Sequence, residues 1–191
     1  MNPVTFKKGK ISLIAQSGDI ATQTAYYFSE EHVDFSKIIS AGNKLHIDEN
    51  DLIEYLVTDK DTDQIHLYLE TIDDGRALIR LARKSKKPIV LFKSNVSRAA
   101  AEVAMSHTAA LSNDNRIVGA AMKQAGIIRV KDIHDMTVCA KALRLPPLAG
   151  NRLAAISLSG GFAVIMGDAC EKAGFQCPKL PDKLLKNYRK Q

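Results

Sequence analysis

The chain alternates short apolar segments with amphipathic segments of helical length, and this alternation constrains its fold more than any other feature. The apolar segments predict buried strands at Ile11–Ala15, Phe35–Ile39, Ile65–Leu69, Pro88–Phe92 and Ile127–Val130. The amphipathic segments predict helices at Ile20–Glu31, Asp48–Val57, Gly75–Ser85, Arg116–Ala125 and Ile133–Leu143. Such alternation is typical of βαβ units with right-handed crossovers around a parallel sheet. We therefore predict a three-layer α/β fold, with helices on both faces of a flavodoxin-like or Rossmann-like sheet.

The pattern stops in the segment LPPLAG, which ends at Gly150, and then restarts. An apolar strand is expected at Leu153–Leu158, then an SGG turn, and then a helix at Phe162–Ala173 that Gly174 ends. We predict a first domain over residues 1–145, a linker over 146–150, and over 151–191 the beginning of a second flavodoxin-like domain. That last part is too short for a core of this class, so we expect it to be truncated or to be completed by another chain.

Composition narrows the classes of protein to which the chain can belong. The three cysteines show no CxxC spacing, no run of about 18 apolar residues occurs, and the N-terminus lacks the apolar region of a signal peptide. We therefore expect reduced thiols, no membrane association and a cytoplasmic location. The net charge of +6 admits nucleic acid as a partner. The basic clusters at Arg83–Lys87 and Lys183–Lys190 lack interleaved aromatics, however, so solvated helix faces explain them more simply and no nucleic acid is expected.

Polar and glycine residues follow the predicted strands, at the edge of a parallel sheet where ligands bind. Ser17 and Gly18 follow the first strand, Glu70 ends the third, and Lys93 follows the fourth. A second glycine turn, at residues 159–161, repeats the pattern of the first in the second domain. Each turn opens a helix, whose N–H groups favour an anion, although tight βα turns also require glycine for steric reasons. Neither turn matches GxGxxG or a P-loop.

His107 lies beyond the fourth strand, in the segment AMSHTAAL, among residues with small side chains. The other histidines are scattered along the sequence, so no metal site is expected. The sequence also lacks the GxSxG motif that a serine hydrolase of this fold class would carry. A histidine that carries a transferred group covalently remains possible, and it would require a carboxylate to orient the ring. Glu70 is the candidate for that carboxylate.

A set of motifs gives these residues a family resemblance. They are AQSGD, SAGNKLHIDENDLIEYL, IHLYLETIDDGR, KPIVLFKSN, MSHTAAL, QAGIIRV and LSGGFAVIMGD. In order and spacing the set resembles the NDP-forming acyl-CoA synthetases, which are relatives of succinyl-CoA synthetase. The resemblance implies that His107 is phosphorylated on a moving loop and that Glu70 orients its imidazole. It also implies that two helix starts bind the phosphate, one at Ser17 and Gly18 and the other at Ser159, Gly160 and Gly161.

The resemblance further implies the reaction of an acid with CoA and ATP to give acyl-CoA, ADP and phosphate. CoA and ATP with its Mg²⁺ would bind to a CoA-binding Rossmann domain and an ATP-grasp domain that this chain lacks, so the chain is not expected to be active alone. Partners are therefore those domains or subunits and a small carboxylic acid, and an oligomer is possible.

The chain departs from the family pattern at a few positions. Glycine is the usual residue where Asn95, Ala109 and Ser112 stand, and a small or neutral residue is usual where Asp19 stands. These departures favour the main alternative, a non-catalytic synthetase-like regulatory or scaffold domain, as in lysine acetyltransferases that carry such a region. His107 and Glu70 favour the ligase. A third interpretation, a generic phosphate-binding α/β module, uses only the glycine turns.

Overall fold

The computed structural model describes residues 8–181 apart from 98, 101 and 103–113. It divides into two compact units, Met1–Leu145 and Pro146–Gln191, and each is described by itself. The predicted histidine, His107, and two of the departures from the family pattern, Ala109 and Ser112, lie outside the described residues.

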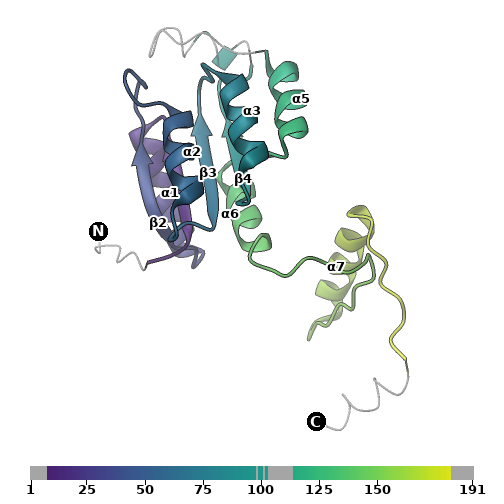
Figure 1. The fold of residues 1–191 in the computed structure, drawn as a ribbon. Coiled ribbons are helices and arrows are strands. Elements are labelled where there is room, and N and C mark those ends of the chain that lie inside the picture. The colour runs from purple at the N-terminus through teal and green to yellow at the C-terminus, as the bar shows by residue number, and fades with distance from the viewer. Residues whose placement is uncertain (1–7, 98, 101, 103–113, 182–191) are drawn as a thin grey trace. The chain divides into compact units, whose positions relative to one another are not determined.

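The first unit is built on a parallel sheet of five strands (Figure 1). The strands are β1 (Ile11–Ala15), β2 (Phe35–Ser40), β3 (Gln64–Leu69), β4 (Ile89–Lys93) and β5 (Ile128–Val130), in the spatial order β2-β1-β3-β4-β5. This is the flavodoxin-like order, in which the chain reverses direction across the sheet between β1 and β3. The prediction of a flavodoxin-like α/β fold is therefore confirmed.

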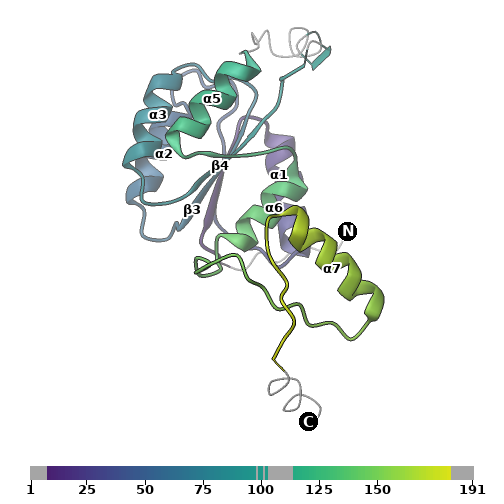
Figure 2. The same cartoon turned by 90° about the vertical axis from the view of Figure 1, so that its right-hand side faces the viewer.

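Helices cover both faces of this sheet (Figure 2). They are α1 (Gly18–Glu30), α2 (Glu49–Thr58), α3 (Gly75–Lys84), α5 (Asn115–Ala125) and α6 (Ile133–Ala142). Side chains alternate across each strand, so neighbouring residues enter different cores. Leu67 of β3 packs in the core beneath α2, α3 and α5, whereas Tyr68 packs in the core beneath α1 and α6. The predicted bounds of these elements agree with the structure to within two residues.

The start of α2 shows why the helix boundaries were readable from the sequence. Asp48 accepts hydrogen bonds from the N–H groups of Asn50 at 2.7 Å and Asp51 at 3.1 Å, and the Asp51 carboxylate accepts one from the Asp48 N–H at 3.0 Å. This reciprocal capping satisfies donors that the first helical turn leaves free. Asp48, where the sequence predicts that this helix begins, is thus its N-cap.

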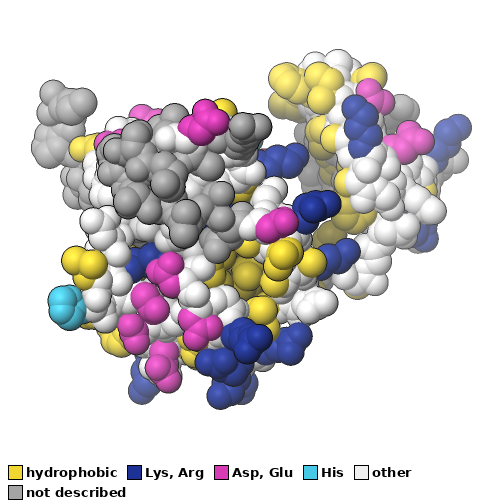
Figure 3. Space-filling model, turned by 90° about the horizontal axis from the view of Figure 1, so that it is seen from above, with side chains coloured by type: hydrophobic (Ala, Val, Ile, Leu, Met, Phe, Trp, Pro, Cys, Tyr) yellow, Lys and Arg dark blue, Asp and Glu magenta, His cyan; other side chains and the backbone are white. Residues whose placement is uncertain are grey.

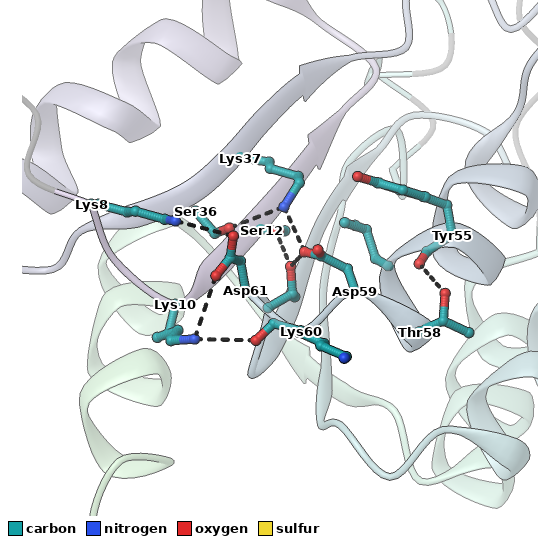
Figure 4. Close-up of polar contacts among 12 residues, drawn as sticks. Lys8, Lys10, Ser12, Ser36, Lys37, Tyr55, Thr58, Asp59, Lys60 and Asp61 are labelled. Carbon is teal, nitrogen blue, oxygen red and sulfur yellow. Dashed lines mark hydrogen bonds and ion pairs between the residues drawn. The ribbon is translucent and has the colours of Figure 1, made fainter.

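The other end of α2 is tied to the sheet by a polar network around Asp59 (Figure 4). The Asp59 carboxylate accepts hydrogen bonds from the Lys37 ammonium at 2.6 Å and the Thr62 hydroxyl at 2.5 Å, and that hydroxyl also contacts the buried Ser12 hydroxyl at 2.7 Å. The hydrogen bond from Lys37, followed by that from Thr62, lowers the pKa of Asp59 to about 2. The network keeps Ser12 satisfied inside an otherwise apolar strand.

The second unit contains one described helix, α7 (Gly160–Lys172), and Gly174 follows it with a φ of 80°. The predicted strand at Leu153–Leu158 is wrong, because the segment is irregular and the unit's described residues contain only one isolated bridge, Arg152 to Gln176. A strand needs neighbours along its length to satisfy its N–H and C=O groups. The segment has the apolar sequence of a strand but no such neighbour among the described residues.

Two compositional predictions can be compared with the structure. The three cysteines are free thiols, and Arg83, Lys84 and Lys86 lie on exposed surface, as expected of a solvated helix face. Among the helices of the described segments, none has the length and apolar character needed to cross a bilayer.

Candidate functional site

The candidate site lies where β1 and β3 end, at the point where the strand order reverses. Figure 3 views the molecule from the side on which the strands end, and shows acidic side chains gathered next to Lys and Arg side chains on part of this face. In parallel sheets, ligands bind beyond the strand ends at such a reversal. Gln16 and Ser17 follow β1, and Glu70 follows β3 directly, so the topology brings Glu70 and the first glycine turn to the same edge.

Gln16 joins the ends of β1 and β3 through its side chain. Its Oε1 accepts hydrogen bonds from the N–H groups of Glu70 at 2.9 Å and Thr71 at 3.1 Å, and its Nε2 donates to the Thr71 hydroxyl at 3.2 Å. The Gln16 N–H in turn donates to the Tyr68 carbonyl at 2.9 Å. These bonds satisfy the backbone N–H groups at the end of β3, and they fix the position of the Glu70 backbone from which its side chain extends.

Lys93, the last residue of β4, holds Glu70 from the other side. Its ammonium donates to the carbonyl oxygens of Glu70 and Ser94, both at 2.6 Å, and the residue is only 4% exposed. Burial is the main cause that lowers the pKa of Lys93 to about 8, and the charge of Arg129 acts in the same direction.

The Glu70 carboxylate is half-buried, and it accepts a hydrogen bond from the Tyr68 hydroxyl at 3.4 Å. Burial is also the largest cause that raises the pKa of Tyr68, with the Glu70 charge contributing, so the phenol stays a neutral donor. The carboxylate is thus held beside the strand end with part of its surface open to solvent. A carboxylate so placed can accept a hydrogen bond from an imidazole N–H.

The first glycine turn presents the start of α1 at the same edge. Ser17 caps the helix by accepting a hydrogen bond from the Ile20 N–H at 3.3 Å. Among the described residues, the N–H groups of Ser17, Gly18 and Asp19 have no acceptor. Gly18 has no positive φ, and an added Cβ would make only an ordinary contact with the Ser40 hydroxyl at 3.5 Å. Chain sterics therefore do not require glycine here, whereas close approach of a ligand to the backbone would.

The loop after β2 lies next to this edge and is held there by Lys44, whose side chain is 2% exposed. The Lys44 ammonium forms ion pairs with Glu49 at 3.0 Å and Asp73 at 2.8 Å, and donates to the Thr71 carbonyl at 3.1 Å. The Glu49 side chain is fully buried, so its pair with Lys44 holds the β2–α2 loop to the start of α2, while the contacts of Lys44 with Thr71 and Asp73 join the loop to the segment that follows Glu70.

Asn95, at a position where the family usually has glycine, is buried and has a φ of 54°. Among the described residues, neither its amide nitrogen nor its amide oxygen has a hydrogen-bond partner. The left-handed backbone at this position explains why glycine is common there, and asparagine is one of the few other residues that tolerate it.

The second glycine turn opens α7 in the second unit. Ser159 is the N-cap without a side-chain capping bond, and its N–H donates to the Ser157 hydroxyl at 3.2 Å. Gly160 and Gly161 have no positive φ, and a Cβ at Gly160 would meet nothing within 4 Å. Neither backbone conformation nor crowding within the described residues requires these glycines.

Within the first unit, the structure therefore brings Ser17, Gly18 and Glu70 to one edge of the sheet, whereas the residues of the second turn lie in the separate unit. Gln16 and the role of Lys93 were missed from the sequence. A signal for Lys93 existed, because it ends the otherwise apolar strand IVLFK at a position whose alternation points it into the core. Gln16 carried no such signal, since its partners are backbone groups of another strand.

Comparison with known proteins identifies relatives over most of the chain. Residues 8–143 match the family model described as succinyl-CoA ligase like flavodoxin domain. The chain is 36% identical over 185 residues to acetate–CoA ligase [ADP-forming] II subunit alpha of Pyrococcus furiosus, covering 96% of this chain and 40% of that protein. It is 39% identical over 175 residues to 4-hydroxybutyrate–CoA ligase [ADP-forming] of Nitrosopumilus maritimus, covering 89% of this chain and 25% of that protein.

A solved structure shows the same relationship. The chain superposes on the dinucleotide-forming acetyl-coenzyme A synthetase 1 of Ca. Korarchaeum cryptofilum, in complex with phosphate and ADP, with a TM-score of 0.84 and 31% identity. That match covers 98% of this chain and 42% of the other. The chain thus spans well under half of the length of each of these relatives.

Proposed function

Because the chain belongs to the ADP-forming acyl-CoA synthetase family, of which it carries the succinyl-CoA ligase-like flavodoxin domain, we propose that it transfers a phosphoryl group through His107. The overall reaction is acid, CoA and ATP to acyl-CoA, ADP and phosphate. The observation that carries this proposal is the position of Glu70, held by neighbouring strands at the edge where α1 presents N–H groups that have no acceptor among the described residues.

In this proposal Glu70 orients the histidine. Its carboxylate accepts a hydrogen bond from one ring N–H of His107, which leaves the other ring nitrogen with a free lone pair as the nucleophile. That nitrogen forms a bond to the phosphorus of ATP as the bond to ADP breaks. It later gives the phosphoryl group to the carboxylate of the acid, and the resulting acyl phosphate is attacked by the thiol of CoA with release of phosphate.

The N-terminus of α1 supports a role in holding the phosphoryl group on His107. The N–H groups of Ser17, Gly18 and Asp19 supply three donors and the positive end of the helix, which together contribute about 0.3–2 kcal/mol to a bound anion. We propose the same role for Ser159, Gly160 and Gly161 at the start of α7. In both turns the glycines leave space that a Cβ would occupy.

The remaining groups of the reaction bind elsewhere in this proposal. CoA supplies the accepting thiol, and ATP with Mg²⁺ supplies the phosphoryl group, through a CoA-binding Rossmann domain and an ATP-grasp domain or subunit. Two relatives from Pyrococcus furiosus are alpha subunits by name, which supports a partner subunit for this chain. A cytoplasmic location and an oligomer remain predictions.

The test is phosphorylation of the chain by γ-labelled ATP in the presence of its ATP-grasp partner. We expect an acid-labile, base-stable label that His107→Ala abolishes and Glu70→Gln reduces, because Gln holds the ring less strongly than a carboxylate does. His46→Ala is the matched control, since His46 is exposed on the loop after β2 and has no role in the proposal. An unlabelled wild type, with a partner shown to be active, would contradict the proposal.

One observation favours the alternative of a non-catalytic regulatory or scaffold domain. Asp19 lies exposed in the first turn of α1, where its carboxylate would repel a phosphate bound to the same N–H groups. The same labelling experiment separates the two functions, because a scaffold domain would carry no label at His107.

A further inference from the structure

The Lys93 ammonium is enclosed at the strand ends, bonded to the backbone of the candidate carboxylate residue, and the reaction as described above does not use it. Lys93 is 4% exposed, and its ammonium donates to two backbone carbonyl oxygens, those of Glu70 and Ser94, at 2.6 Å each. Two short charge-assisted bonds to carbonyl groups hold a lysine more firmly than a surface ion pair would. Lys93 therefore joins the end of β3 to the segment that follows β4.

The backbone groups on both sides of Glu70 are held by side chains from neighbouring strands. The Glu70 N–H donates to Gln16 at 2.9 Å, and the Glu70 carbonyl accepts from Lys93. Within the part of the chain that the structure describes, the side chain itself has one long hydrogen bond, 3.4 Å, from the Tyr68 hydroxyl. The direction of the Glu70 carboxylate thus depends on its backbone, and the backbone depends on Lys93 and Gln16.

We propose that Lys93 is a positioning residue for phosphoryl transfer: its ammonium form fixes the backbone at Glu70 and Ser94 so that Glu70 meets the imidazole in one orientation. This inference rests on the proposed function of Glu70. Loss of the charge removes both bonds together, because a neutral amine is a weaker donor to carbonyl groups. A displacement of about 1 Å at a catalytic carboxylate costs on the order of 10²-fold in rate.

The charge of Lys93 is conditional on pH. Burial is the main cause that lowers its pKa to about 8; the charges of Arg129 of β5 and Lys44 of the β2–α2 loop act in the same direction, and the Glu70 carboxylate opposes them. Tyr68 of β3 also faces this edge, but its raised pKa keeps it neutral over the same range. The ammonium form therefore prevails at neutral pH and declines above about pH 8.

Lys87 provides a matched control at the start of β4. Its ammonium also donates to two carbonyl oxygens, those of Leu56 at 2.7 Å and Asp59 at 2.5 Å, but at the edge of the sheet where the strands begin. Lys87→Met therefore removes the same kind of contact as Lys93→Met, far from Glu70 in the strand direction.

The experiment measures the initial rate of labelling at His107 by ATP, with the active ATP-grasp partner, from about pH 6.5 to pH 10. We expect the wild-type rate to fall above about pH 8. Lys93→Met should lower the rate about 10- to 100-fold at pH 7 and show no such fall, so that the two rates converge toward pH 10. Lys93→Arg keeps the charge, so we expect partial recovery of the rate and loss of the fall above pH 8. Lys87→Met should retain the wild-type rate and pH profile. Unfolding of each variant is measured in parallel, so that only folded protein is compared.

The outcomes distinguish this inference from the proposed function. If His107→Ala abolishes the label while Lys93→Met keeps the wild-type rate and pH profile, the proposed function stands and the inference on Lys93 is overturned. An equal loss in Lys93→Met and Lys87→Met, with unchanged pH profiles, also overturns it, because a general structural effect would then explain both. If the wild type takes up no label, the proposed function is contradicted, and the inference on Lys93, which rests on it, is overturned with it.

Discussion

At the scale of single residues, this chain repeatedly uses lysine side chains to join backbone carbonyl groups of neighbouring elements. Lys93 reaches the end of β3, Lys87 reaches the end of α2, and Lys44 reaches Thr71. A buried ammonium with carbonyl and carboxylate acceptors satisfies several orphan oxygen atoms at once. The sequence shows these lysines but not their acceptors, which belong to segments distant in the chain.

The buried pair of Lys44 and Glu49 gives the first prediction on stability. Lys44→Met leaves the fully buried Glu49 carboxylate without a counter-charge, and we expect a loss of about 3–5 kcal/mol in the free energy of unfolding. Asp73→Asn removes the other ion pair of Lys44, but the Asp73 side chain is 63% exposed, so we expect less than about 1 kcal/mol. Urea unfolding at pH 7 measures both. Equal losses in the two variants would contradict this assignment.

Asn95 gives a prediction of the opposite sign. Glycine adopts a φ of 54° without strain, and Asn95→Gly removes an amide that is buried without a described partner, so we expect a gain of about 1 kcal/mol. Asn95→Ala removes the same amide but keeps the backbone strain, and should be about 1 kcal/mol less stable than Asn95→Gly. Thermal unfolding compares the three proteins. A loss of stability in Asn95→Gly would show that the amide is paired.

At the scale of elements, the strands and helices of the first unit were predictable because each carries its own local signal. Strand β3 is buried at all six positions, four of which carry Ile, Leu or Tyr, and α2 begins at a capping aspartate. The segment Leu153–Leu158 has the same apolar signal and yet forms no strand. A strand is completed by hydrogen bonds to its neighbours, and a single segment's sequence does not state whether those neighbours are present.

A buried histidine in β3, His66, is expected to make the stability of the protein sensitive to acid. His66 is fully buried, with Nε2 3.0 Å from the Gln64 side-chain oxygen, and burial, followed by the charge of Arg144, lowers its pKa to about 3. Below about pH 6.5 the unfolded chain binds a proton that native His66 does not. The free energy of unfolding should therefore fall by about 1.4 kcal/mol per pH unit from this group, from about pH 6.5 down to about pH 3.

His66→Gln should abolish this contribution to the pH dependence, because glutamine does not titrate and can still bond to Gln64. The measurement is urea unfolding at pH 7, 6 and 5 for the wild type and for His66→Gln. His134→Gln is the control, since His134 is exposed and contacts only the Tyr27 hydroxyl among the bonds described. A wild-type slope that persists in His66→Gln would place the proton uptake on another group.

At the scale of the whole molecule, the sequence predicted more of the fold than of the site. The alternation of strands and helices gave the parallel sheet, and the sheet's topology accounts for the meeting of Glu70 with the start of α1. The bonds that orient Glu70, from Gln16 and Lys93, join three strands and follow only from coordinates. His107 was identified through motif resemblance, and its role stays a prediction because it lies outside the described residues.

The two units differ in how much apolar surface they bury, and this difference predicts how they exchange amide hydrogens. Every residue of β3 is buried, whereas α7 has no buried residue and exposes Phe162, Val164 and Ile165. Since a helix of this length is marginal without packing, α7 should open far more often than the sheet.

Hydrogen exchange followed by mass spectrometry on the intact chain tests this. We expect peptides from residues 160–172 to exchange within about seconds to minutes, and those from β1 and β3 to remain protected for about hours, since local opening free energies range from near zero to the global value. The measurement is repeated over a tenfold range of protein concentration. Protection of α7 equal to that of β3 at every concentration would mean that apolar residues exposed in the described structure are covered within the chain itself, whereas protection that grows with concentration would assign the cover to a second copy.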